Sequence, residues 1–88
     1  MNRKTHEDQL EQKLDEARAL VSVGSEYRHY KGGHYIVIDL AITESDNSAC
    51  VIYRALYGRG LIFTRPVSSW TEEVKTSDGV MKRFQKTN

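Results

Sequence analysis

Tyrosine and basic side chains gather in one part of this sequence. All five tyrosines lie between residues 27 and 57, and arginine, histidine and lysine residues are interleaved with them. A guanidinium group presents a planar fork of donors that suits phosphate or carboxylate, and a phenol ring presents a flat face on which another ring can stack. The cluster therefore predicts binding of a small anionic ligand that carries a ring, of the nucleotide type. The candidate ligand-binding residues are Tyr27, Arg28, His29, Tyr30, Lys31, Tyr53, Arg54, Tyr57 and Arg65.

A purely structural interpretation of the same residues is also open. Tyrosine favours β-strands and fits the core of a small β domain, and arginine or lysine residues that alternate with it simply face water. The sequence alone leaves undecided whether the cluster forms a pocket or part of the core.

No group of residues points to catalysis or to a metal. Cys50 could act with His29 or His34, but it lies among apolar residues of a candidate strand, where a buried and inert thiol is usual. The two histidines flank a glycine turn without the further ligands that a zinc site needs. Glu72 and Glu73 are more simply explained as part of a solvated surface than as an acid–base pair. The protein is therefore expected not to be an enzyme and to use no metal or cofactor.

Length and composition indicate one small globular domain. The 88 residues are 39% apolar and 28% charged, and the single cysteine cannot form an intrachain disulfide. No apolar run approaches the ~18 residues that a membrane-spanning helix needs. These features predict a cytoplasmic protein without a membrane partner.

The formal charge is nearly balanced at +1, which weakens the case for a nucleic-acid partner. Its distribution is less even. Residues 47–71 contain Arg54, Arg59 and Arg65 and no acidic residue. We expect a local positive surface in that segment.

The first part of the chain has the pattern of an amphipathic helix. Thr5 and Asp8 have the spacing of a capping box, and Gly24 lies where a left-handed C-terminal cap is expected, so a helix is predicted over residues 6–22. The narrow apolar stripe can pack on the rest of the domain or pair with the same helix of a second chain, which makes segment 1–23 a candidate for homo-oligomerisation. The stripe consists of Leu10, Leu14, Ala17 and Val21.

The rest of the chain is predicted to be mainly β, which makes the fold α+β overall. Short runs rich in Val, Ile, Tyr and Thr alternate with glycine-containing turns. Five or six short antiparallel strands in about 65 residues close most easily into a small barrel, because closure removes exposed edges. A single helical turn is expected near residues 68–73. The candidate strands are residues 26–30, 34–43, 49–56, 61–65 and 80–84, with a sixth at 73–76.

Two features of these strands bear on the candidate site. Alternation along strand 34–43 defines one apolar face that we expect to be the core. That face consists of Ile36, Ile38, Leu40 and Ile42. Glycine turns at 31–33 and 58–60 are expected to bring the segments 27–35 and 53–65 together at one end of the barrel. Arginine and tyrosine side chains would then share its rim.

Four strings carry a family resemblance: YRHYKGGHYIVIDLA, VIYRALYG, TRPVSSW and DGVMKRF. In order and spacing they resemble domain of unknown function 1653, a family of short bacterial and phage proteins. Residues 24–84 fit the pattern throughout, apart from the residues just before Arg65 and at Trp70. The resemblance implies an SH3-like small barrel over residues 24–88 and brings no assigned activity. The helical segment 1–23 lies outside it.

Three functions follow from these observations. The first is a non-catalytic binding domain that captures a small anionic, nucleotide-type ligand through the arginine and tyrosine surface. In a phage, such capture would suit counter-defence by sequestering a host signal. The second is a protein–protein adaptor with an SH3-like aromatic groove. The third is weak nucleic-acid binding by the same surface.

Overall fold

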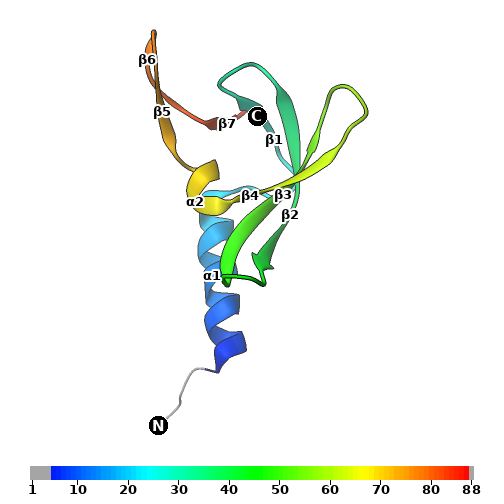
Figure 1. Ribbon diagram of the computed structural model, residues 1–88, viewed down its shortest axis with the longest axis vertical. Coiled ribbons are helices and arrows are strands. Elements are labelled where there is room, and N and C mark those ends of the chain that lie inside the picture. The colour runs from blue at the N-terminus through cyan, green and yellow to red at the C-terminus, as the bar shows by residue number, and fades with distance from the viewer. Residues whose placement is uncertain (1–4, 88) are drawn as a thin grey trace.

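A single long helix leads into a β-rich body in the computed structural model, which describes residues 5–87 (Figure 1). The helix α1 (His6–Leu20) begins at the predicted capping box. The Thr5 hydroxyl accepts a hydrogen bond from the Asp8 N–H at 3.1 Å, and the Asp8 carboxylate accepts one from the Thr5 N–H at 3.2 Å. Further along, the Lys13 ammonium donates to the Asn47 carbonyl at 2.7 Å, which ties α1 to the turn at residues 44–47.

The end of α1 differs from the prediction. Val21 is extended, with φ −128° and ψ 123°, and its N–H makes the last hydrogen bond to the Ala17 carbonyl. The predicted cap at Gly24 is wrong, although this glycine does have a φ of +84°. It lies in a separate turn after the helix, where its N–H donates to the Val37 carbonyl at 2.8 Å. A short extended link therefore replaces the last predicted helical residues.

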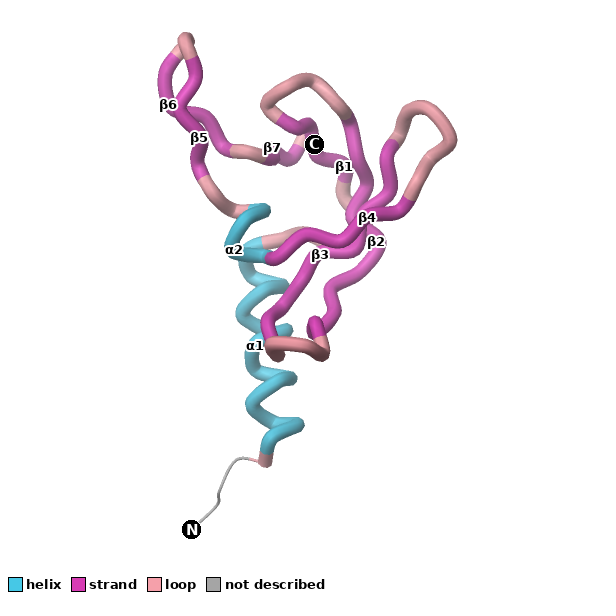
Figure 2. Tube along the Cα trace, in the orientation of Figure 1, coloured by secondary structure: helices cyan, strands magenta, loops and turns pink. Residues whose placement is uncertain are grey.

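Five strands form one antiparallel sheet in the order β4-β3-β2-β1-β7 (Figure 2). The mainly β, antiparallel architecture after one N-terminal helix is therefore confirmed. The predicted C-terminal strand is two strands separated by Arg83, and the first of them pairs with β5 in a separate hairpin. The strands are β1 (Glu26–His29), β2 (His34–Thr43), β3 (Ser48–Ala55), β4 (Ile62–Pro66), β5 (Glu73–Thr76), β6 (Gly79–Lys82) and β7 (Phe84–Lys86).

The closed SH3-like barrel is not confirmed, because the sheet is open. Its edge strands are β4 and β7, and among residues 5–87 neither pairs with the other. β4 runs directly into α2 (Val67–Trp70), which matches the predicted helical turn, and the β5–β6 hairpin stands apart from the sheet. Closure is unnecessary for burial, because α1 and α2 cover the apolar face that a barrel would otherwise enclose.

The predicted isoleucine face of β2 is wrong in the first half of the strand, where Val37 is buried in place of Ile36 and Ile38, and it is right at Leu40. Val37 pairs with Tyr53 and Asp39 pairs with Ile52, so Ile38 is left over as a β-bulge. The extra residue places both Val37 and Leu40 on the buried face, while Ile38 is 40% exposed. Period-two alternation fails here because a bulge shifts the facing of every residue after it.

The core lies between the sheet and the two helices. Ala17 and Val21 are the buried part of the α1 stripe, and they pack in one cluster with apolar residues of β2 and β3. This end of the stripe is therefore covered by the chain's own sheet. Of the two alternatives that the sequence left open, this part of the stripe follows packing on the rest of the domain. The remaining buried members of the cluster are Tyr27, Val37, Leu40, Val51, Tyr53, Val67, Trp70 and Phe84.

Two neighbouring residues, the last residue of α1 and the extended residue after it, test whether this end of the helix packs into the core. Val21 is 1% exposed and Leu20 is 63% exposed. Val21→Ala should lower the free energy of unfolding by about 2 kcal/mol, because it removes buried methyl groups and leaves a cavity. Leu20→Ala, as the matched control, should change it by less than about 0.5 kcal/mol. Urea denaturation measures both, and equal effects would show that the helix does not dock as described.

Candidate ligand-binding site

Two of the predicted binding residues belong to an aromatic core instead. Tyr27 and Tyr53 are both 6% exposed, and each meets the ring of Trp70 edge-on, with centroids 5.3 and 4.9 Å away. The Tyr27 hydroxyl accepts a hydrogen bond from the Ser22 N–H at 2.9 Å. Because their faces are covered, these two tyrosines stabilise the fold and offer no open stacking surface.

Arg65 is also held inside the fold. Its guanidinium lies 5.4 Å from the centre of the Phe84 ring, within cation–π range, and its Nη1 donates to the Ser69 hydroxyl at 3.0 Å. Its Nε is buried without a hydrogen-bond partner among the described residues. Arg65 therefore links β4 to α2 and to β7, which is a structural role that the sequence did not reveal.

The two glycine turns do come together, as expected. The hydroxyls of Tyr35 and Tyr57 are hydrogen-bonded at 2.6 Å, and the Leu56 N–H donates to the His34 carbonyl at 2.9 Å. A Cβ at Gly33 would lie 3.2 Å from the Tyr35 ring and 3.3 Å from the Tyr57 ring, so glycine permits this close approach. Tyr57 is 54% exposed but is engaged with Tyr35.

Three other predicted residues line a surface hollow of about 360 Å³, which we name the Arg28 hollow. Arg28, His29 and Tyr30 come from the end of β1 and the turn after it. The opposite wall comes from β6, β7 and the residue that follows, and it consists of Met81, Lys82, Gln85, Lys86 and Thr87. Segments more than fifty positions apart in the sequence thus form one site, because β7 pairs with β1.

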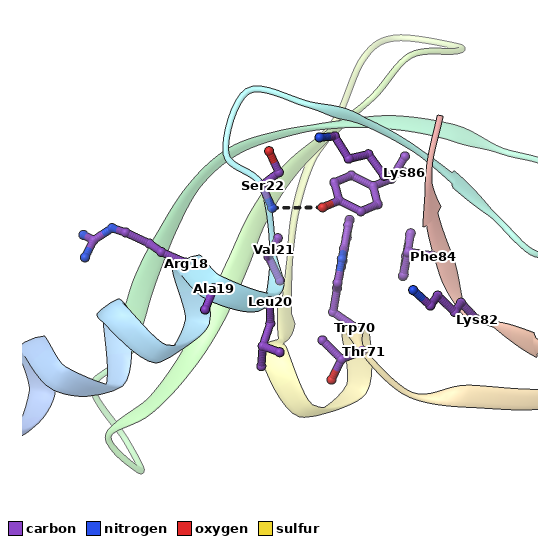
Figure 3. Close-up of a pocket in the computed structure, with 11 residues that line it drawn as sticks. Arg18, Ala19, Leu20, Val21, Ser22, Trp70, Thr71, Lys82, Phe84 and Lys86 are labelled. Carbon is purple, nitrogen blue, oxygen red and sulfur yellow. Dashed lines mark hydrogen bonds between the residues drawn. The ribbon is translucent and has the colours of Figure 1, made fainter. Parts of the chain in front are cut away.

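A second hollow of about 390 Å³, which we name the Trp70 hollow, lies where α1, α2 and β7 meet. Figure 3 shows Trp70 and Phe84 with parallel rings in its wall, flanked by Lys82 and Lys86, and Leu20 at the helix end. Arg18 also lines it, but its guanidinium points away and is paired with Asp15 at 2.7 Å. This hollow therefore combines an apolar wall with two lysines.

The electrostatics of both hollows are positive. Arg28, Lys82 and Lys86 form no ion pair within residues 5–87, although Glu73 is the cross-strand neighbour of Lys82. Among the described residues no carboxylate lines either hollow. Lys82 and Lys86 belong to both, so the positive charge is continuous between them.

His29 adds no net charge to the Arg28 hollow at neutral pH. Burial lowers the pKa of His29, and the positive charges of Arg65, Arg83 and Lys31 lower it further. The neutral ring accepts a hydrogen bond from the Lys31 N–H at its Nδ1 and packs against the edge of Phe84 at 4.8 Å. The charge of this hollow therefore comes from arginine and lysine alone.

The predicted positive surface of residues 47–71 is divided by the fold. Arg54 is exposed on β3 beside Gly60, and Arg65 is half-buried over Phe84, so neither joins Arg28. Lys31 is exposed, and its ammonium lies 5.8 Å from the centre of the Tyr30 ring. The predicted set of binding residues did not include Lys82 and Lys86. The sequence did contain a signal for them, because residues 79–88 have three basic residues and no acid.

The described part of the chain lacks both a metal-binding cluster and a membrane-spanning helix. No group of three or more histidine, cysteine, aspartate or glutamate side chains within residues 5–87 is placed to hold a metal ion. Within the same range no helix has the length and apolarity to span a membrane.

Comparisons with known proteins identify relatives of unknown activity. Residues 25–86 match the model of a family described as protein of unknown function, DUF1653. The chain is 41% identical to a DUF1653 protein of known crystal structure from Bordetella bronchiseptica, with a TM-score of 0.66, over 70% of this chain and 82% of the other. No curated protein matches the sequence.

The tyrosine pair predicts a specific alkaline behaviour. Burial, followed by the hydrogen bond to Tyr57, raises the pKa of Tyr35 from 10.0 to about 12. A phenol whose pKa is higher in the folded state stabilises the fold fully below pH 10, and this stabilisation is lost as the pH rises from about 10 to 12. In Tyr35→Phe the free energy of unfolding, measured by urea titration, should therefore fall less over that range than in the wild type.

Tyr30→Phe is the matched control for this experiment, because Tyr30 lies outside the pair. It should keep the wild-type decline between pH 10 and 12. If Tyr35→Phe and Tyr30→Phe decline equally, the hydroxyl pair does not couple to folding.

Proposed function

The chain belongs to the DUF1653 family of proteins of unknown function, and we propose that it is a non-catalytic binding domain that captures a small anionic ligand with an aromatic ring in the Arg28 hollow. The proposal follows the sequence prediction in its chemistry and changes the residues that carry it. Arg28, His29 and Tyr30 remain, while Lys82 and Lys86 replace Arg54 and Arg65.

One observation carries this proposal: three unpaired cations line a single hollow that no described carboxylate neutralises. Like charges that face one hollow repel each other, so an anion that enters relieves this repulsion as well as forming its own contacts. Arg28 offers a planar fork of donors, and Lys82 and Lys86 offer compact ammonium groups. Phosphate is the anion that this combination suits best.

The same hollow can also accommodate a ring. Tyr30 is half-buried, and Met81 of β6 lines the same hollow with a flexible thioether side chain. A base that lies between a phenol ring and a thioether gains stacking and dispersion contacts. This favours a nucleotide-type ligand over inorganic phosphate. Capture without turnover is also what a phage counter-defence role would require.

A thermal-shift and calorimetric titration with nucleotides tests the proposal. A ligand at 100 times its dissociation constant should stabilise the folded state by about 2.7 kcal/mol. Arg28→Ala should weaken its binding by about 1.5 to 3 kcal/mol without unfolding the chain, because Arg28 is exposed and makes no ion pair within residues 5–87.

Arg54→Ala is the matched control, since Arg54 is an exposed arginine of the same sheet that lies outside the Arg28 hollow. The affinity of the Arg54→Ala variant for the nucleotide should equal that of the wild type. Equal losses in Arg28→Ala and Arg54→Ala would indicate non-specific attraction to positive charge, and the absence of any stabilising nucleotide would reject the proposed ligand class.

A protein adaptor is the second candidate, and the apolar end of the β3–β4 hairpin favours it. An apolar hollow of about 210 Å³ lies there between Tyr57, Leu61 and Phe63, which are all exposed. Aromatic grooves of SH3-like domains bind proline-rich peptides. Fluorescence anisotropy with a labelled proline-rich peptide tests this function, and Phe63→Ser should abolish the binding. Ile38→Ser, at an exposed isoleucine outside this hollow, should not.

A further inference from the structure

The Arg28 hollow and the Trp70 hollow meet at one sheet edge. Neighbouring residues of β1 are divided between them, since Tyr27 lines the Trp70 hollow and Arg28 lines the Arg28 hollow. Phe84 and Gln85 of β7 are divided in the same way. Successive side chains of a strand point to opposite faces, so the two hollows lie on opposite faces of the sheet beside its β7 edge. Lys86, at that edge, and Lys82 line both.

Each hollow has its own wall for a ring. The Arg28 hollow offers Tyr30 and Met81, and the Trp70 hollow offers the exposed Leu20 side chain, which lies beside the buried Trp70 and Phe84 rings. The cations common to both hollows lie between these walls. Apolar surface on two sides with positive charge in the middle is complementary to two rings joined by an anionic group.

The backbone of β7 supplies a further donor at the same place. The Tyr30 N–H donates to the Arg83 carbonyl and the Thr87 N–H donates to the Glu26 carbonyl, so every second pair of the β1–β7 ladder is hydrogen-bonded. Lys86 lies opposite Tyr27, and these two residues form a pair without backbone hydrogen bonds between them. The Lys86 N–H is therefore directed away from β1, toward the outer side of the edge. This N–H is a donor for a phosphate at the edge where Lys82 and Lys86 line both hollows.

We propose that the ligand has a ring–phosphate–ring form and straddles the β7 edge, with one ring in each hollow and its phosphate over Lys82 and Lys86. This inference rests on the proposed function, and it specifies the ligand as a dinucleotide unit. The unit can come from a free dinucleotide or from a step of a single-stranded nucleic acid, because both have this chemistry.

The test compares the dinucleoside monophosphate ApA with AMP by isothermal titration calorimetry. AMP carries more negative charge, so charge alone predicts that AMP binds more tightly. If the second ring is bound, ApA should bind about tenfold more tightly than AMP, because the second base buries apolar surface against Leu20. A ten-residue oligoadenylate forms the third arm. If the oligoadenylate, counted per dinucleotide step, binds as tightly as ApA, the natural ligand is a single-stranded nucleic acid. If it binds more weakly per step than ApA, the natural ligand is a free dinucleotide.

Leu20→Glu distinguishes the two hollows, because it adds a carboxylate to the Trp70 hollow at a side chain that is already exposed. It should reduce ApA affinity to the level of AMP or below it, because ApA carries less negative charge, and it should weaken AMP much less than ApA. Val23→Glu is the matched control at an exposed valine outside both hollows, and it should change neither.

The outcomes separate this inference from the proposed function. If AMP binds in an Arg28-dependent manner and ApA binds no more tightly, the two-hollow ligand is wrong and the single-hollow function stands. If Leu20→Glu weakens AMP and ApA equally, the second ring does not occupy the Trp70 hollow. If neither ligand binds, both proposals fail.

Discussion

The stacked pair of Trp70 and Phe84 is the contact on which the rest of the structure depends. The two rings are parallel within 2°, with centroids 3.7 Å apart, and both residues are almost completely buried. Phe84 also meets the rings of His29, Tyr35 and Tyr53 and lies beneath the guanidinium of Arg65. One side chain of a three-residue strand thus contacts β1, β2, β3, β4 and α2. Without it, β7 would be held beside β1 mainly by the backbone hydrogen bonds of the β1–β7 ladder.

This contact also explains why the charged residues meet. Lys82 and Lys86 lie two residues before and after Phe84, and the docking of its ring fixes the chain between them at the sheet edge. Arg28 reaches the same edge because β1 pairs with β7. The buried aromatic residues therefore form the scaffold of the hollow, and arginine and lysine residues outside the core provide its positive charge.

An open sheet, in place of a closed barrel, is what leaves this edge available. The helices α1 and α2 cover the apolar face, and the chain continues from β4 into α2 without pairing back to β7. A barrel would have used the outward backbone groups of β7 for strand pairing. In the open arrangement the Lys86 N–H and the lysine side chains face a surface where a ligand can approach from both sides of the sheet.

Local patterns in the sequence determined most of the secondary structure. The Thr5–Asp8 capping box, the residues of β2 and the helical turn that became α2 were predictable, because each depends on side chains within a few positions of one another. The residues of the arginine and tyrosine cluster divided into core and surface only in the folded chain. The bulge at Ile38, the open sheet and the convergence of Arg28 with Lys82 and Lys86 were decided by tertiary structure. These features depend on which strands pair and on which ring fills the core between distant segments, and such contacts leave no periodic signal along the sequence.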